Sequence, residues 1–282
     1  MPSALLFPGQ GSQEADMRAI VAAERPDLLA LACELVGEDP FERLHAGTAF
    51  HQPAIYCASL ARFARIAEQP DWFAGHSLGE ISALAAAGAL SAEDGLRLVV
   101  TRGRLMQRVA ETGPEGAMLA VGMGIGPARA LAAALGLTVA NDNSPEQVVL
   151  SGWVGAIEHA RTEVKRRGMR AFRLRIEGAF HAPELAAVQP EFRAALDAVT
   201  LHEPQRPVLS CVTACEFDDV RRRLAESLTS GVRWREVLLA LRARGVERFV
   251  EVGPGQALTK LVRATLVGVD ACAATLAERV DG

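Results

Sequence analysis

A serine between two glycines is the residue best placed to do covalent chemistry. Residues 75–79 read Gly-His-Ser-Leu-Gly, where a strand-like run at 72–75 passes into a helix-like run at 79–87. A serine on such a sharp turn is pushed out of the backbone, so its hydroxyl is exposed. The N–H group of Leu78 then points into the same space, where it can bind an oxyanion. The spacing predicts Ser77 as a nucleophile; the alternative is a tight turn with an incidental serine.

A serine hydroxyl is a poor nucleophile unless a base takes its proton. His181 lies in a loop-like stretch, residues 178–183 (Gly-Ala-Phe-His-Ala-Pro), which suits a positioned base. A side chain at position 76 is expected to point away from Ser77 on the turn. Residue chemistry alone leaves His181 balanced against the other five histidines together, which are His45, His51, His76, His159 and His202.

The runs that must position these residues alternate between strand-like and helix-like patterns, which indicates an α/β fold. We expect strands at residues 4–7, 72–75 and 246–252 and helices at residues 53–67, 79–87, 92–110 and 258–266. Residues 253–255 read Gly-Pro-Gly, and we interpret them as a structural turn beside the site, because they lack the lysine and hydroxyl residue of a phosphate loop.

A stretch in the middle of the chain has a different pattern of expected strands and helices. Its expected strands are residues 117–123, 138–140, 147–150 and 170–174, and its expected helices are residues 127–135 and 154–167. A turn-rich run at 141–145 separates the second strand from the third. The order βαββαβ is that of a ferredoxin-like unit. We therefore expect an inserted subdomain at residues 116–176 within a core built from residues 1–115 and 177–282.

Composition excludes several function classes. The chain has 282 residues with 30 basic and 34 acidic side chains, so its net charge of −4 argues against a nucleic-acid or anionic-membrane partner. Its apolar runs are too short to span a membrane, and no basic residue precedes the apolar residues 4–7 as in a secretory signal. Five scattered cysteines without a CxxC indicate reduced thiols and no metal site. We expect a cytoplasmic protein.

Six stretches, in this order, carry a resemblance that runs nearly the whole chain. They are residues 7–13 (Phe-Pro-Gly-Gln-Gly-Ser-Gln), 75–80 (Gly-His-Ser-Leu-Gly-Glu), 101–107 (Thr-Arg-Gly-Arg-Leu-Met-Gln), 143–149 (Asn-Ser-Pro-Glu-Gln-Val-Val), 178–181 (Gly-Ala-Phe-His) and 251–255 (Glu-Val-Gly-Pro-Gly). Together they resemble the malonyl-CoA:acyl carrier protein transacylases, or acyl-carrier-protein S-malonyltransferases. The resemblance implies a hydrolase-like three-layer core with a parallel sheet and a ferredoxin-like insert, in agreement with the pattern of runs.

The resemblance also implies roles for the catalytic residues. Ser77 accepts the malonyl group, and His181 is first the general base and then the general acid. The backbone N–H groups of Gln10 and Leu78 form the oxyanion hole. In this family a backbone carbonyl, instead of an acidic side chain, orients the histidine, and a loose alignment puts that carbonyl near Arg233.

Arg102 is implied to hold the free carboxylate of the malonyl group. Malonyl differs from acetyl by this one carboxylate, and a guanidinium offers it two parallel donors. A charged hydrogen bond contributes about 1.5–3 kcal/mol, or about 10- to 100-fold in discrimination. From the residues alone, a surface arginine on a helix is the better reading of Arg102; the surrounding motif reverses it.

Four further residues are implied in the substrate pocket. In related polyketide acyltransferases a phenylalanine just before the histidine goes with malonyl and a serine with methylmalonyl, so Phe180 predicts malonyl selection; the alternative is that its ring only packs under the subdomain junction. Gln52 is expected to line the gorge. Asn143 either touches substrate or is a turn asparagine, and Met106 is either a soft pocket wall or core.

The implied reaction is ping-pong transfer from malonyl-CoA to the phosphopantetheine thiol of an acyl carrier protein, by a monomer with no metal or other cofactor. Carrier proteins are usually acidic, and two basic clusters are candidates for docking them: residues 161–175, with seven basic side chains against Glu163, and the three arginines 221–223. Solvated helix faces are the alternative for both clusters.

Other functions stay open at this stage. A serine hydrolase or thioesterase could use the same turn, because acids such as Asp142, Glu146, Glu158, Glu163 and Glu177 precede His181. A non-catalytic carrier-binding subunit is a second alternative. The pathway is also open: fatty acid biosynthesis, and so lipid metabolism, is the default, but polyketide synthesis and malonate decarboxylase use the same motifs.

Overall fold

The first strand, β1 (Ser3–Phe7), is apolar on both faces and lies at the centre of a five-stranded parallel sheet. The structure is a computed structural model that describes residues 1–67, 69–176 and 178–274. The sheet order is β7-β2-β1-β8-β9, with β2 at Trp72–Gly75, β7 at Val208–Leu209, β8 at Arg248–Glu251 and β9 at Asp270–Ala273. Every strand pair in this sheet is parallel, as the sequence predicts.

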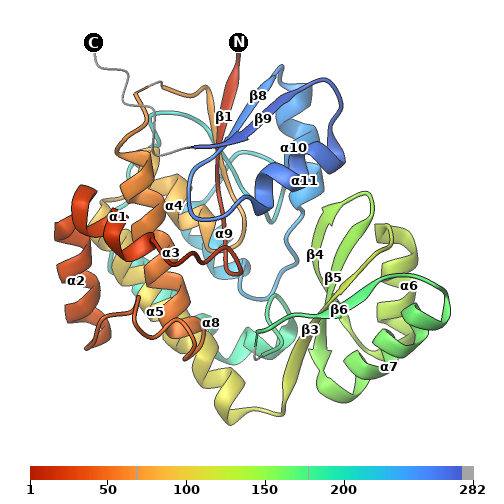
Figure 1. Ribbon diagram of the computed structural model, residues 1–282. Helices are drawn as coiled ribbons and strands as arrows, with labels where there is room; N and C mark the ends of the chain where they lie inside the picture. Colours follow the sequence, from red (N-terminus) through yellow and green to blue (C-terminus); the bar gives the residue numbers. More distant parts are fainter. Residues whose placement is uncertain (68, 177, 275–282) are drawn as a thin grey trace.

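Helices cover both faces of this sheet, as parallel strands require. Leu5 and Phe7 pack into one core with residues of α1 (Met17–Glu24), α2 (Pro26–Val36), α3 (Thr48–Phe63), α4 (Gly79–Ala86), α5 (Ala92–Thr112), α8 (Gln189–Asp197) and α9 (Val220–Glu226). Ala4 and Leu6 point to the opposite face, where they pack against α10 (Trp234–Ala243) and α11 (Ala257–Thr265). The result is the predicted three-layer core (Figure 1).

The middle of the chain forms a second, antiparallel sheet of order β4-β5-β3-β6. Its elements follow the predicted βαββαβ order: β3 (Gly116–Val121), α6 (Ile125–Leu135), β4 (Thr138–Ser144), β5 (Gln147–Trp153), α7 (Val154–Arg166) and β6 (Ala171–Arg173). These elements share a hydrophobic core of their own. In Figure 1, α6 and α7 lie on the side of this sheet turned away from the five-stranded core.

The prediction of a turn at residues 141–145 is wrong for most of that stretch. β4 continues to Ser144, because Asn141 and Asp142 pair with β5 across β-bulges. The other edge of β4 also has a partner: the Val232 N–H donates to the Ala140 carbonyl, and the Asp142 N–H donates to the Val232 carbonyl, both at 2.8 Å. A strand with partners on both sides tolerates polar residues that a sequence pattern assigns to a turn.

Several elements were not predicted from the sequence, including α1, α2, α8, α9, α10, β7 and β9. Helix α3 begins at Thr48 and ends at Phe63, so Pro53 lies inside it and does not start it. No helix in the described part of the chain is both long and apolar enough to cross a membrane.

Candidate active site

Ser77 stands on a tight turn from β2 into α4, and its φ is +55°. The two flanking glycines are required by close approach of backbone. A Cβ atom on Gly75 would lie 2.0 Å from the Gly79 carbonyl, and one on Gly79 would lie 2.0 Å from the carbonyl oxygen of Phe7. Without a side chain, Gly75 lets the turn close on the start of α4, and Gly79 lets α4 begin against the end of β1.

His181 meets this serine from the segment that follows the four-stranded sheet. Its Nε2 lies 2.7 Å from Ser77 Oγ, and its Nδ1 lies 2.9 Å from the Ser227 carbonyl and 3.1 Å from the Ser230 carbonyl. Carbonyl oxygens only accept, so Nδ1 carries the proton and Nε2 is free to accept one from the serine.

The position of the orienting carbonyl corrects the expectation. The sequence places it near Arg233, but the Arg233 carbonyl accepts the Val237 N–H at 3.0 Å in α10. The oxygens that face His181 belong to Ser227, at the end of α9, and to Ser230, in the loop after it. Main-chain acceptors carry no residue signature, which is why the alignment could miss by several residues.

The pKa of His181 is lowered to about 3, chiefly because the imidazole is buried and then because Arg102 and His76 lie near it. Burial disfavours the charged ring, and a neighbouring positive charge does so as well. The histidine is therefore neutral at pH 7 and able to act as a base.

Arg102 reaches the same serine from the middle of α5. Its side chain is 2% exposed; Nη2 donates to Ser77 Oγ at 3.1 Å and Nη1 donates to Gln52 Oε1 at 2.8 Å. Burial lowers its pKa to about 10, so the guanidinium stays charged at neutral pH. The surface alternative for Arg102 is wrong: a buried positive charge lies beside the nucleophile.

Contrary to expectation, Gln52 is not among the residues that line the cavity above Ser77. It is fully buried in α3, and its amide nitrogen donates to Thr48 Oγ1 at 2.8 Å and contacts the sulfur of Met106 at 3.2 Å. Its amide oxygen faces the guanidinium of Arg102. Gln52 thus fixes the direction of that side chain from behind.

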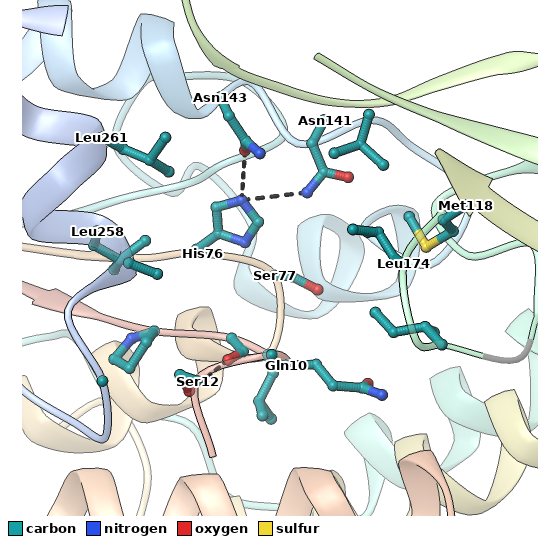
Figure 2. Close-up of a pocket in the computed structure, with 18 of the residues that line it drawn as sticks. Gln10, Ser12, His76, Ser77, Met118, Asn141, Asn143, Leu174, Leu258 and Leu261 are labelled. Atoms are coloured by element: carbon teal, nitrogen blue, oxygen red, sulfur yellow. Dashed lines mark hydrogen bonds between the residues drawn. The ribbon is translucent and has the colours of Figure 1, made fainter. Parts of the chain in front are cut away.

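A cavity of about 600 Å³ opens above Ser77 between the two sheets. Its lining brings together eight residues that the sequence singled out: Gln10, Ser77, Leu78, Arg102, Met106, Asn143, Phe180 and His181. Figure 2 shows Ser77 at its centre, with Met118 and Leu174 on one side and Leu258 and Leu261 on the other.

Gln10 and Leu78 line the same cavity as Ser77. Within the described residues, neither backbone N–H group donates to another backbone group. The Gln10 side chain is held by Thr48 Oγ1 at 2.8 Å and by His51 Nδ1 at 3.0 Å, which fixes the loop after β1. One free donor at the start of α4 and one in the loop after β1 are suited to bind a negatively charged oxygen.

Phe180 is buried and faces the cavity, immediately before His181. A Cβ atom on Gly178 would lie 2.6 Å from its ring, so this glycine makes the space that the ring occupies. Met106 is buried on the cavity wall one helical turn after Arg102.

His76 points away from the nucleophile, as expected, and its ring joins the two halves of the molecule. Its Nε2 lies 2.9 Å from Asn143 Oδ1 and 3.2 Å from Asn141 Nδ2, both on β4 (Figure 2). Its ring also packs edge-on against Trp234. Asn143 is thus a strand residue on the cavity wall, not a turn asparagine. No motif in the sequence pointed to Asn141.

A serine hydrolase would need an acid beside His181, but the candidate acids that the structure describes do not bond to this histidine. Asp142 forms a bidentate ion pair with Arg235, and Glu158 and Glu163 pair with arginines on or near α7. Within the described residues, no carboxylate bonds to His181; Glu177 lies outside them. Nor do three or more metal-ligating side chains gather anywhere in that part of the chain.

Much of each basic cluster is already neutralised. Arg166 and Arg167 pair with Glu163, Arg161 pairs with Glu158, and Arg222 and Arg223 pair with Asp218. Three basic residues of the first cluster have no ion-pair partner among the described residues: Lys165, Arg170 and Arg175.

Comparisons with known proteins agree with this geometry. Residues 33–280 match the family model of the acyl transferase domain. The chain is 42% identical to the polyketide biosynthesis protein ThaF of Burkholderia thailandensis, over 93% of this chain but only 24% of ThaF. It is 36% identical to the polyketide biosynthesis malonyl CoA-acyl carrier protein transacylase BaeC of Bacillus velezensis, over 91% of this chain and 94% of BaeC.

A malonyl CoA-acyl carrier protein transacylase of Synechocystis is 37% identical over 94% of each chain. The solved malonyl-CoA:acyl carrier protein transacylase of Xanthomonas oryzae superposes with a TM-score of 0.89 at 34% identity, covering 98% of this chain and 96% of that one. Matches of this extent and identity establish the family. The chain is an acyltransferase that belongs to the malonyl-CoA:acyl carrier protein transacylase family.

Proposed function

We propose that this enzyme moves a malonyl group from malonyl-CoA to the phosphopantetheine thiol of an acyl carrier protein, through an ester on Ser77. The observation that carries the proposal is the guanidinium of Arg102, buried 3.1 Å from Ser77 Oγ. A charge in that position favours an acyl group that ends in a carboxylate. The names of BaeC and the Synechocystis relative support the same donor and acceptor.

In the first half-reaction, His181 Nε2 takes the proton of Ser77 while Oγ bonds to the thioester carbon. The oxyanion that forms is bound by the N–H groups of Gln10 and Leu78, and each such donor is worth about 10²–10³-fold in rate. When the carbon–sulfur bond breaks, His181 returns its proton to the departing CoA sulfur. The products are the malonyl ester of Ser77 and free CoA.

The second half-reaction runs the same steps with a new thiol. His181 takes the proton of the phosphopantetheine thiol, whose sulfur attacks the ester carbon. The oxyanion forms in the same hole, and Ser77 leaves with the proton that His181 held. Arg102 holds the acyl group while the ester waits for this thiol. Once Ser77 Oγ is esterified, the malonyl carboxylate replaces it as the acceptor for Nη2, and Gln52 continues to accept from Nη1.

Two kinds of carrier are candidates. Carriers of fatty acid biosynthesis are the default candidate for this chemistry. Carriers of polyketide biosynthesis are the second candidate, because ThaF and BaeC both bear that description. The ratio of kcat/KM for the two kinds of carrier, measured side by side with the same malonyl-enzyme, decides between them.

Positive charge on the inserted subdomain, part of it beside the cavity at Arg175, suits an acidic carrier. Arg175 and Gln10 line a second cavity of about 550 Å³, which shares Gln10, Leu174 and Ile176 with the first. Lys165 and Arg170 are exposed on the same subdomain. Unpaired positive charges at the rim of a site speed the encounter with a negatively charged partner.

Intact-protein mass spectrometry after brief incubation with malonyl-CoA tests the proposal. The protein is expected to gain one malonyl group, and Ser77→Ala, which keeps the cavity but loses the hydroxyl, is expected to gain none. Acetyl-CoA in parallel is expected to label far less. Release of CoA without an adduct would instead favour a thioesterase, and neither adduct nor CoA would refute both functions.

A further inference from the structure

A buried carboxyl with no evident role lies just behind the nucleophile. Glu80 is in the first turn of α4, and its side chain is 0% exposed. Its Oε1 accepts a hydrogen bond from the Cys211 N–H at 2.7 Å. Its Oε2 is also buried, yet it has no hydrogen-bond partner among the described residues. A buried carboxylate oxygen without a donor is costly, so this group calls for a compensating charge.

That charge comes from Arg102. The hydrogen bonds of Arg102 go to neutral partners, Gln52 and Ser77, so nothing bonded to it cancels its charge. Glu80 raises the pKa of Arg102, and Arg102 lowers the pKa of Glu80, as expected of opposite charges that share a poorly solvated interior. In the free enzyme, Glu80 is thus the counter-ion of Arg102 without touching it.

Few other groups act on this carboxyl. From the segment after β7, the Cys211 N–H donates to its Oε1, and the uncharged side chains of Ser210 and Cys211 lie near it; from α5, Arg102 supplies the opposite charge. The thiol of Cys211 is neutral, because burial raises its pKa well above the ordinary value. The neighbouring α3, β1 and β2 supply none of these principal influences. Burial outweighs the other effects and raises the pKa of Glu80 to about 7.

We propose that Glu80 and the carboxylate of the bound acyl group exchange places as counter-ion of Arg102, so that loading a dicarboxylic acyl group takes up one proton at Glu80. The inference rests on the proposed function, in which Arg102 holds that carboxylate. The incoming negative charge compensates Arg102 directly and disfavours a second negative charge behind it. The proton comes from solvent and adds at Oε2, the oxygen that no donor satisfies. One carboxylate enters, one is neutralised, and the net charge of the site stays the same.

This exchange makes acyl selection depend on pH. Proton uptake favours malonyl loading at low pH. The preference falls as pH rises above about 7, the pKa to which Glu80 is raised in the free enzyme. Acetyl loading brings no negative charge, so it takes up no proton. His181 cannot produce the same dependence, because its pKa lies near 3 and it remains neutral throughout.

The test is the ratio of acylation rate constants for malonyl-CoA and acetyl-CoA, measured by quenched-flow mass spectrometry from about pH 6.5 to about pH 8.5. One unit of pKa shift corresponds to a tenfold change, so we expect the ratio to fall by about three- to tenfold across this range in the native enzyme. In Glu80→Gln, which keeps an oxygen for the Cys211 N–H but cannot ionise, the ratio is expected to be flat.

Glu251→Gln is the matched control. Glu251 is a second buried carboxyl with a raised pKa, but it accepts hydrogen bonds from Leu258 and Thr259 at the start of α11 and has no part in the Arg102 site. We expect this variant to retain the native pH dependence. A flat ratio in Glu251→Gln, or a native slope in Glu80→Gln, would overturn the inference.

A second measurement needs no variant to fold. An indicator dye in weak buffer reports the protons taken up when native enzyme is mixed with malonyl-CoA, with acetyl-CoA as the blank. Near pH 7.5 we expect net uptake of a sizeable fraction of one proton for each Ser77 acylated. A malonyl ester formed without proton uptake refutes the exchange and leaves the proposed function standing. No malonyl ester at any pH refutes the proposed function as well.

Discussion

Ser77 and His181 share the same unusual backbone conformation, with φ +55° at both residues, although 104 positions separate them. Left-handed conformations are rare for residues with a side chain and cost about 1–3 kcal/mol each. In both cases the conformation turns the side chain out of its segment and into the cavity, where Oγ and Nε2 meet at 2.7 Å. β2 and α4 hold the backbone on either side of Ser77, and the carbonyls of Ser227 and Ser230 hold the ring of His181, so the pair is aligned before substrate arrives.

Removing the guanidinium should abolish the preference for malonyl. Arg102→Ala loses the charge that faces the acyl carboxylate, so we expect the malonyl-to-acetyl ratio of acylation rate constants to fall about 10- to 100-fold. Arg102→Lys keeps the charge but lacks the fork that Gln52 and the acyl group share, so its ratio should be intermediate. An unchanged ratio in Arg102→Ala would remove this residue from substrate selection.

The acid side of the pH profile should be flat. An ordinary histidine base loses activity below about pH 6.5, because the protonated ring cannot accept a proton. The pKa of His181 is lowered to about 3, so the acylation rate should hold from about pH 6.5 down to about pH 5. Half-maximal activity near pH 6.5 in rapid-quench experiments would contradict this.

The same shift has a cost in stability. Between about pH 6.5 and pH 3 the unfolded chain binds a proton at position 181 that the folded chain excludes, so the free energy of unfolding should decrease as pH falls through this window. Comparing urea unfolding of the native enzyme with that of His181→Ala over this range isolates the contribution.

Selection against a methyl branch should depend on the ring of Phe180. A methyl group in a pocket is worth about 1–3 kcal/mol, so Phe180→Ser should narrow the ratio of malonyl-CoA to methylmalonyl-CoA specificity constants by about tenfold or more. Phe180→Leu retains an apolar side chain and serves as the control for lost packing. If both variants keep the native ratio, the ring only fills space beneath the junction.

Carrier docking should depend on arginines that lack an acidic partner within the described structure. Arg170→Glu is expected to raise the KM for the carrier about three- to tenfold, with a weaker effect at high salt. Arg166→Glu places the same charge on the same subdomain, but it disturbs an existing pair with Glu163 and should have a smaller effect. Equal KM values in the two variants would argue against this docking surface.

The two glycines of the elbow should tolerate no side chain. Gly79→Ala would push a Cβ atom to 2.0 Å from the Phe7 carbonyl, and we expect a loss of about 3 kcal/mol or more in the free energy of unfolding. Gly126→Ala is the control: nothing lies within 4 Å of its Cβ position in α6, so it should be neutral or stabilising by up to about 1 kcal/mol. Thermal unfolding of both variants checks the contrast.

Features that depend on the type of side chain could be predicted from the sequence. The parallel sheet, the βαββαβ insert and the turn at Ser77 follow from apolar periodicity and glycine spacing, and the structure has all three. Arg102 could be singled out only through its motif, because burial of an arginine is invisible in one sequence. The acceptors of His181 are main-chain oxygens of Ser227 and Ser230, which any residue could supply. Gln52 was misplaced because its contact depends on how α3 packs against α5.

The loop that orients the base is also a strand partner of the inserted sheet. Ser230 faces His181, and two residues later Val232 forms two backbone hydrogen bonds with β4, where Gly231 passes so close that a Cβ atom would lie 2.5 Å from the Val139 carbonyl. Any hinge motion that lifted this sheet would pull on the acceptors of the imidazole. The two sheets therefore cannot move apart while His181 stays aligned. We expect the pantetheine arm of a substrate to enter a cavity that is already formed, without a domain closure.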